Sequence, residues 1–305
     1  TAFVQSGKEY AVRRAKCTWN ENNALSEIMW GVSQNRTLSK YKNFRKLLKT
    51  YKFIYEECLK SGAVIHITAD KSSLKKLLPQ IRQFIIDSKI TKLLPKTKYE
   101  LKDYLSEIYK VDNYFKKDKT EIIKVHSQTG YAVTVTPSSE YLTKEAAAES
   151  VFASWFSMHT LWEKFRFTGG AYGASVWPDN IDNTLIMSTY RDPSPQKSYD
   201  VYIDALKEIS QVIIPEEDIE RSIVSIYGDA IVPMTPKDRA KGVFEGLLFA
   251  NYGFKPLRVK NILNVSSQDV QKAAQNLYEM AQNKHYNVVF CDKSVKTSGN
   301  ILKIP

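Results

Sequence analysis

The hydrophobic positions of residues 1–90 alternate between helical and strand-like spacing. In the helical stretches, apolar side chains recur every three or four residues, and in the strand-like stretches β-branched residues cluster. Polar residues 20–23 and 70–73 supply helix starts, and Ser61-Gly62 ends the long middle helix. The expected elements are a strand at 9–16, a helix from about 20, a helix at 39–60, a buried strand at 63–68 and a helix from about 73. They predict part of an α/β layer.

Lysine-rich residues 91–120 interrupt this pattern and contain Pro95, so we expect a connection with one helix near 99–109. A second module follows from 121. Its expected elements are strands at 121–125 and 131–136, a helix at 143–165, a strand at 174–190, helices at 195–210, 216–227, 236–251 and 267–282, and a strand at 286–291. Because strands and helices do not alternate regularly, we predict an α+β fold: two modules of mostly antiparallel sheet with helices packed on one face. The predicted domains are 1–90, a connection at 91–120, and 121–305.

Composition leaves this picture unchanged. Of 305 residues, 43% are hydrophobic and 25% charged, as in ordinary globular proteins. No apolar run approaches the ~20 residues of a membrane-spanning helix, and the amino end lacks the pattern of a signal peptide. We therefore expect no membrane partner. The chain begins with Thr rather than Met, which favours a piece of a longer protein.

The net charge of +11 raises nucleic acid as a partner. The lysines are spread along helical segments, usually near glutamates, and this distribution is typical of solvated helix faces, so we expect no nucleic-acid partner. Cys17, Cys58 and Cys291 are far apart and form no Cys-x-x-Cys pair. They indicate neither a disulfide framework nor a zinc ribbon, and they favour a reducing compartment such as the cytoplasm.

Catalytic motifs are absent from the sequence. The four histidines, at 66, 126, 159 and 285, form neither His-x-x-Glu-His nor His-Glu-x-x-His, and a catalytic zinc needs about three converging ligands. No Gly-x-Ser-x-Gly elbow occurs, and the glycines at 169–173 lack the pattern of a phosphate loop. We therefore predict no metal site and no catalytic residue in this chain.

The glycine turn is nonetheless the most informative place. Arg166 closes the inward stripe of the preceding helix, next to Gly169 and Gly170, and Tyr172 follows six residues later. An arginine and a tyrosine beside uncovered backbone can donate hydrogen bonds to a peptide carbonyl. Alternatively, the glycines only make the turn and Arg166 caps the helix carbonyls. Spacing alone leaves both interpretations open. The stripe consists of Ala148, Phe152, Trp155, His159, Trp162 and Arg166.

Residues 161–173, LWEKFRFTGGAYG, resemble the carboxy-terminal signature of presequence proteases in the pitrilysin/insulinase family of inverted-zinc-motif peptidases. Further blocks follow in the order of that subgroup, and residues 24–33 and 62–70 resemble the end of its third domain. The additional blocks are TYRDP at 189–193 and YGD at 227–229. The resemblance extends from about residue 9 to 292.

The resemblance implies a protein of two similar halves, each of two α/β domains, closing around a peptide chamber. The amino-terminal half carries zinc and a glutamate base, and the carboxy-terminal half contributes an arginine and a tyrosine, here Arg166 and Tyr172, that bind substrate backbone. Gly169 and Gly170 belong to the same substrate-binding turn. Such donors stabilise charge that develops on the scissile carbonyl. The implied partners are the amino-terminal half and unfolded peptides, and zinc is the implied cofactor of the parent enzyme.

The resulting hypothesis is a non-catalytic carboxy-terminal half of a zinc metalloendopeptidase that degrades unfolded peptides. Residues 1–90 would be an incomplete third domain and residues 121–305 the fourth. Because the zinc half is absent, activity is not carried over to this chain alone. The alternative is a pseudo-protease or partner subunit that binds peptide or braces a separate zinc subunit.

Overall fold

The computed structural model describes residues 2–38, 43–60, 63, 65–90, 119–179, 182–248 and 255–304. The chain divides into two compact units: Thr1–Thr37, Leu101–Val232 and Phe254–Pro305 form the first, and Leu38–Glu100 and Pro233–Gly253 the second. In this division, residues before 38 belong with the carboxy-terminal part. The domains 1–90 and 121–305 of a longer protein stay a prediction.

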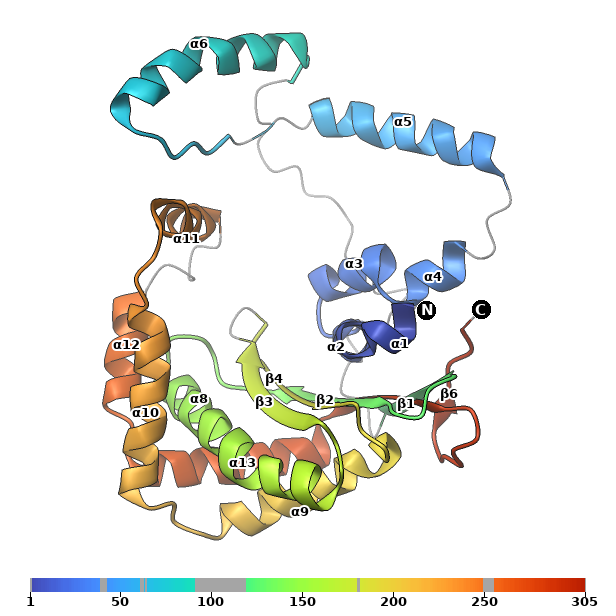
Figure 1. The fold of residues 1–305 in the computed structure, drawn as a ribbon, viewed down its shortest axis with the longest axis vertical. Helices are drawn as coiled ribbons and strands as arrows, with labels where there is room; N and C mark the ends of the chain where they lie inside the picture. The colour runs from blue at the N-terminus through green and yellow to red at the C-terminus, as the bar shows by residue number, and fades with distance from the viewer. Residues whose placement is uncertain are drawn as a thin grey trace. The chain divides into compact units, whose positions relative to one another are not determined.

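A six-stranded sheet organises the first unit (Figure 1). Its strand order is β3-β4-β2-β5-β1-β6, and β1 runs parallel to β5 and β6 while the other neighbours are antiparallel. The predicted α+β class with a mostly antiparallel sheet is therefore confirmed. The strands are β1 (Lys119–Val125), β2 (Tyr131–Pro137), β3 (Gly173–Asp179), β4 (Thr184–Tyr190), β5 (Tyr286–Asp292) and β6 (Asn300–Ile301).

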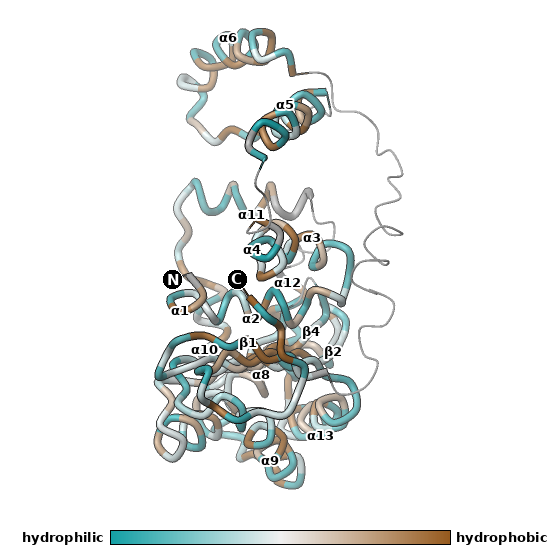
Figure 2. Tube along the Cα trace, turned by 90° about the vertical axis from the view of Figure 1, so that its right-hand side faces the viewer, coloured by the Kyte–Doolittle hydropathy of each residue, from teal (hydrophilic) through white to brown (hydrophobic). Residues whose placement is uncertain are grey.

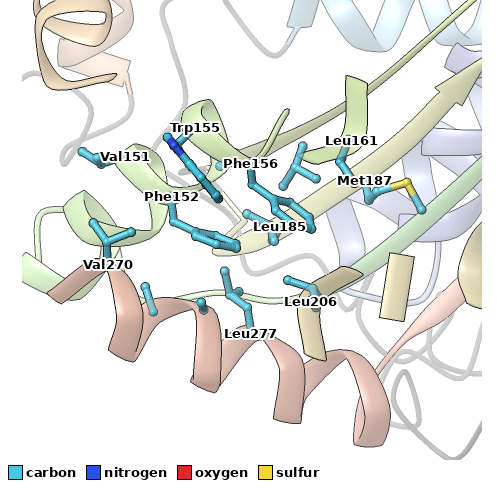
Figure 3. Close-up of a cluster of buried hydrophobic side chains, with 14 of the residues drawn as sticks. Val151, Phe152, Trp155, Phe156, Leu161, Leu185, Met187, Leu206, Val270 and Leu277 are labelled. Carbon is cyan, nitrogen blue, oxygen red and sulfur yellow. The ribbon is translucent and has the colours of Figure 1, made fainter. Parts of the chain in front are cut away.

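One face of the sheet is covered by helices that enclose the larger core cluster. In Figure 3, Phe152 and Phe156 lie between the sheet residues Leu185 and Met187 and the neighbouring helices. Burying an aromatic or aliphatic side chain of this size contributes roughly 1.5–3 kcal/mol, so this layer supplies much of the stability. The helices of this layer are α8 (Lys144–Phe156), α9 (Ser198–Ser210), α10 (Glu216–Ile231), α12 (Lys255–Leu263) and α13 (Ser267–Asn283).

The opposite face of the sheet is covered by the amino-terminal helices, in addition to the helices predicted on one face. Helix α2 (Gly7–Lys16) packs on β2 and β5 and replaces the strand predicted at 9–16. Ala11 and Ala15, four residues apart, are fully buried, and such small side chains let a helix lie close to a sheet. The short helix α1 (Ala2–Gln5) precedes it, and α3 (Glu21–Trp30) and α4 (Val32–Leu38) follow.

The predicted strand at 174–190 is instead the hairpin of β3 and β4. Asn183, with φ +51°, leads into β4, and asparagine tolerates this left-handed conformation well. The predicted helix at 143–165 does begin at its Thr143 cap, but α8 ends at Phe156 and continues as the π-helix η2 (Ser157–Thr168). A short 3-10 turn, η3 (Pro195–Lys197), leads into α9.

The described part of the second unit is helical. It contains α5 (Phe44–Lys60), α6 (Lys71–Asp87) and α11 (Pro236–Leu248), and Figure 2 shows apolar and polar positions interspersed along α5 and α6. The buried strand predicted at 63–68 was wrong: described residues 63 and 65–68 are irregular and Ile65 is exposed. No described strand of this unit is available to pair with them. The helix predicted near 99–109 lies outside the described residues.

Among the helices that the structure describes, none combines the length and the apolar character that crossing a membrane requires.

Candidate functional site

The two residues singled out at the glycine turn come together at the end of η2. Nη1 of Arg166 donates a hydrogen bond to the backbone oxygen of Tyr172 at 3.3 Å. Its guanidinium carbon lies 4.3 Å from the ring centroid of Trp162 and 5.3 Å from that of Tyr172. Cations over aromatic faces at such distances are attracted by the ring quadrupole. The guanidinium is therefore oriented by two rings and one carbonyl.

The glycines form the turn, as both interpretations required. Gly170 has a φ of +72°, and a Cβ on Gly169 would lie only 2.8 Å from the backbone oxygen of Phe165. That helix-end oxygen accepts a hydrogen bond from the amide of Ala171 at 2.9 Å. Arg166 thus donates across the turn to Tyr172, rather than to the helix-end carbonyl as the capping interpretation had it.

Two further residues of the site escaped the sequence reasoning. Tyr190, at the end of β4, packs edge-on against Tyr172 with ring centroids 5.8 Å apart, and the guanidinium carbon of Arg191 lies 5.6 Å from the Tyr190 ring. The sequence signal for both residues is the TYRDP block at 189–193, in which an aromatic residue and an arginine are adjacent. We call Trp162, Arg166, Tyr172, Tyr190 and Arg191 the aromatic–arginine ladder.

Arg191 has a φ of +47°, the left-handed region that a bulky residue rarely adopts. Holding a residue there costs about 1–3 kcal/mol, and the surrounding structure must enforce it. Here the neighbouring Asp192 and Gly130 exchange two backbone hydrogen bonds of 2.7 and 2.9 Å. The amide of Tyr172 also donates to the oxygens of Tyr190 and Arg191 at 3.1 and 3.4 Å. The conformation of Arg191 is thus fixed from both sides.

The beginning of η2 is also fastened to the sheet. Ser157 Oγ accepts a hydrogen bond from the amide of Val176 in the edge strand β3 at 2.8 Å, and it donates to the oxygen of Ala153 at 2.7 Å. The first residue of η2 is therefore bonded to strand β3. Near the end of η2, Arg166 is bonded to Tyr172, the residue that precedes β3. π-helical turns occur frequently at functional sites because they shift side chains relative to an α-helix.

A zinc site does not fit the residues that the structure describes, because no three histidine, cysteine or carboxylate side chains gather there. His159 stacks on Trp155 with ring centroids 5.2 Å apart, and His66 stacks on Phe244 at 5.0 Å. Nδ1 of His285 lies 3.1 Å from the hydroxyl of Tyr199.

Comparisons with known proteins agree with the resemblance. A family profile described as "PreP C-terminal domain" matches residues 133–294. The mitochondrial presequence protease of Candida albicans is 21% identical over 299 residues, which cover 94% of this chain and 28% of that protein. The mitochondrial presequence protease of Schizosaccharomyces pombe is 27% identical over 169 residues, covering 55% of this chain and 17% of that protein.

A solved structure has the same fold. It is a conserved protein from Enterococcus faecalis V583, with a TM-score of 0.51 and 13% sequence identity, and the match covers 75% of this chain and 51% of that one. The chain spans less than a third of the lengths of the two curated relatives above, 28% and 17%.

Proposed function

Because the chain belongs to the family of PreP C-terminal domains, we propose that it is the non-catalytic carboxy-terminal half of a zinc metalloendopeptidase that degrades unfolded peptides. The amino-terminal half of the same protein would hold the zinc, which supplies a Lewis acid beside the scissile carbonyl when bound. This chain would supply the surface that binds and orients the peptide backbone.

The observation that carries this proposal is the orientation of Arg166. A guanidinium has five N–H donors, and among the described residues Arg166 has one hydrogen bond, to the Tyr172 oxygen, so donors remain for a ligand. Tyr172 is 61% exposed and carries a phenolic hydroxyl. Gly169 and Gly170 have no side chains that would keep a peptide from the turn.

Carbonyl oxygens of an extended peptide are the acceptors that match this donor set. Because two rings and a carbonyl already hold the guanidinium, it would need little reorganisation when negative charge develops on a substrate oxygen. Arg166 and Tyr172 would therefore act as substrate-backbone donors, with Gly169 and Gly170 providing access.

The test is hydrolysis of a quenched, unstructured peptide by this chain alone and after mixing with the separately produced amino-terminal half and zinc. We expect no cleavage by the chain alone and cleavage on mixing. The test variant is Arg166→Ala. Its matched control is Arg221→Ala, which removes a surface arginine of α10 that pairs with Glu217.

Two outcomes would contradict the proposal. Cleavage by the isolated chain would refute its non-catalytic role. No cleavage by halves that associate and contain zinc would instead support a pseudo-protease or partner subunit that binds peptide.

A further inference from the structure

Arg191 is the second arginine of the aromatic–arginine ladder. The proposed function assigns binding of the substrate backbone to Arg166 and Tyr172, and it gives Arg191 no role. We propose that Arg191 determines specificity by binding a carboxylate of the peptide that the ladder holds. The carboxylate is either an acidic side chain or the peptide's own carboxy terminus. This inference rests on the proposed function, because it requires a peptide at the ladder.

The ladder has the dimensions of a short peptide segment. Arg166 lies 5.3 Å from the Tyr172 ring, that ring lies 5.8 Å from the Tyr190 ring, and Arg191 lies 5.6 Å from the Tyr190 ring. An extended peptide advances about 3.3 Å per residue, so a segment of about five residues is long enough to reach from Arg166 to Arg191. A peptide whose backbone contacts Arg166 can thus place a side chain or its end at Arg191.

The guanidinium of Arg191 forms no ion pair within the described part of the chain. The ion pairs there involve Arg14, Arg221 and several lysines, and none includes Arg166 or Arg191. The adjacent carboxylate of Asp192 is buried and accepts hydrogen bonds from the amide of Ser194 at 2.8 Å and the hydroxyl of Ser198 at 2.5 Å. Asp192 therefore faces the interior, while Arg191 is exposed.

The backbone of Arg191 gives a second, independent argument. Glycine or asparagine would occupy its left-handed conformation with less strain, so the backbone alone does not call for an arginine. Strained residues of this kind occur at ligand clamps, where the side chain needs a fixed position. A planar guanidinium forms two parallel hydrogen bonds with a carboxylate, and a carboxylate is therefore the ligand that it recognises best.

The test measures binding of dye-labelled, unstructured peptides to the 305-residue chain by fluorescence anisotropy at low salt. One peptide carries a central Glu, a second has Gln there, and each is made with a free and with an amidated carboxy terminus. We expect the carboxylate to tighten binding about fivefold, as for other exposed ion pairs of good geometry. Loss of the advantage on Glu-to-Gln replacement identifies a side chain, and loss on amidation identifies the carboxy terminus.

Three variants assign the effect to Arg191. Arg191→Gly suits the left-handed backbone and removes the charge, so it should fold and should abolish the preference for the carboxylate. Arg191→Lys should retain part of the preference, because it keeps the charge without the planar pair of donors. Arg221→Gly, at a surface arginine elsewhere in the same unit, should retain all of it.

The inference fails, while the proposed function stands, if all four peptides bind wild type equally well. It also fails if Arg191→Gly keeps the preference. If no peptide binds, both the inference and peptide binding by this chain are refuted. Tighter binding of a short single-stranded oligo-dT than of the Glu peptide would refute it in favour of a nucleic-acid site.

Discussion

The two ends of the β3–β4 hairpin treat positive charge in opposite ways. At the turn of the hairpin, the buried ammonium of Lys16 forms ion pairs with Asp182 and, at 2.7 Å, with Asp179. At the open end, Arg166 and Arg191 lie on aromatic rings, and the described residues offer them no carboxylate partner. At the turn, two carboxylates neutralise the cation. At the open end, two cations without carboxylate partners among the described residues are available to a ligand.

The difference separates residues that hold the fold from residues that bind. Asn20 and Asn23 add amide donors to Asp182, so the first cluster joins α2 and α3 to the hairpin through the interior of one unit. A buried charge without such partners would be costly. The ladder needs no such compensation because water reaches it, and its charges can therefore be used by a ligand.

The largest expected effect is on turnover of the parent enzyme. Arg166→Ala or Tyr172→Phe should each lower kcat/KM by about 10²–10³, as for the loss of one preorganised donor. Zinc content and the urea midpoint should stay at wild-type values, because neither side chain is buried in the core. If both variants cleave at the wild-type rate, Arg166 and Tyr172 do not act as substrate-backbone donors.

Next in size is the effect of Lys16→Met on stability. It leaves Asp179 and Asp182 without their cation, and we expect the free energy of unfolding of the 305-residue chain to fall by about 3 kcal/mol. Urea unfolding followed by circular dichroism measures this. Lys284→Met, at an exposed lysine, is the matched control and should change it by less than about 0.5 kcal/mol. An equal loss in the two variants would show that the cluster does not stabilise the fold.

The smallest effect is a pH dependence at the same cluster. Burial alone would raise the pKa of Asp182, but Lys16 and the two asparagine amides outweigh it and hold the pKa below its ordinary value. Because the folded-state pKa is the lower one, the stabilisation is present above about pH 4 and is lost as the pH falls further. The difference in unfolding free energy between wild type and Asp182→Asn should therefore shrink on acidification.

Buried Glu27 and Glu149 have raised pKa values, since burial disfavours their charged forms, and they act in the opposite direction. They are common to both proteins and cancel in the difference. A difference that stays constant between about pH 6 and pH 3 would contradict the role of Asp182.

Elements with local signals were predictable from the sequence. The caps at Asn20, Asp70 and Thr143 mark helix starts that the structure has, because a short polar side chain satisfies free backbone amides wherever the helix lies. Helix α2 was missed because alternating Tyr10 and Val12 look like a strand, and only the sheet beneath makes Ala11 and Ala15 its buried face. Whether this segment forms a helix or a strand is therefore decided by its packing on the sheet and not by its local sequence pattern.

The same distinction holds for the candidate site. Arg166 and Tyr172 lie six residues apart, so their approach follows from one helix end and one turn, and the sequence indicated it. Tyr190 reaches them only through the antiparallel register that pairs it with Gly173. That register depends on the turn between β3 and β4, whereas the sequence pattern predicts one continuous strand at 174–190. Without the turn, neither Tyr190 nor Arg191 is expected near Tyr172.

The central position of β5 has a consequence for biosynthesis. This strand lies between β2 and β1, and it also supports α2, yet it is made after nearly all of the unit that it completes. Until Tyr286–Asp292 leave the ribosome, β1 lacks both of its described neighbours, β5 and β6, and helix α2 lacks much of its docking surface. Pairing over such long stretches of chain folds slowly and leaves strand edges open in the meantime. The nascent chain should therefore depend on chaperones until β5 has been synthesised.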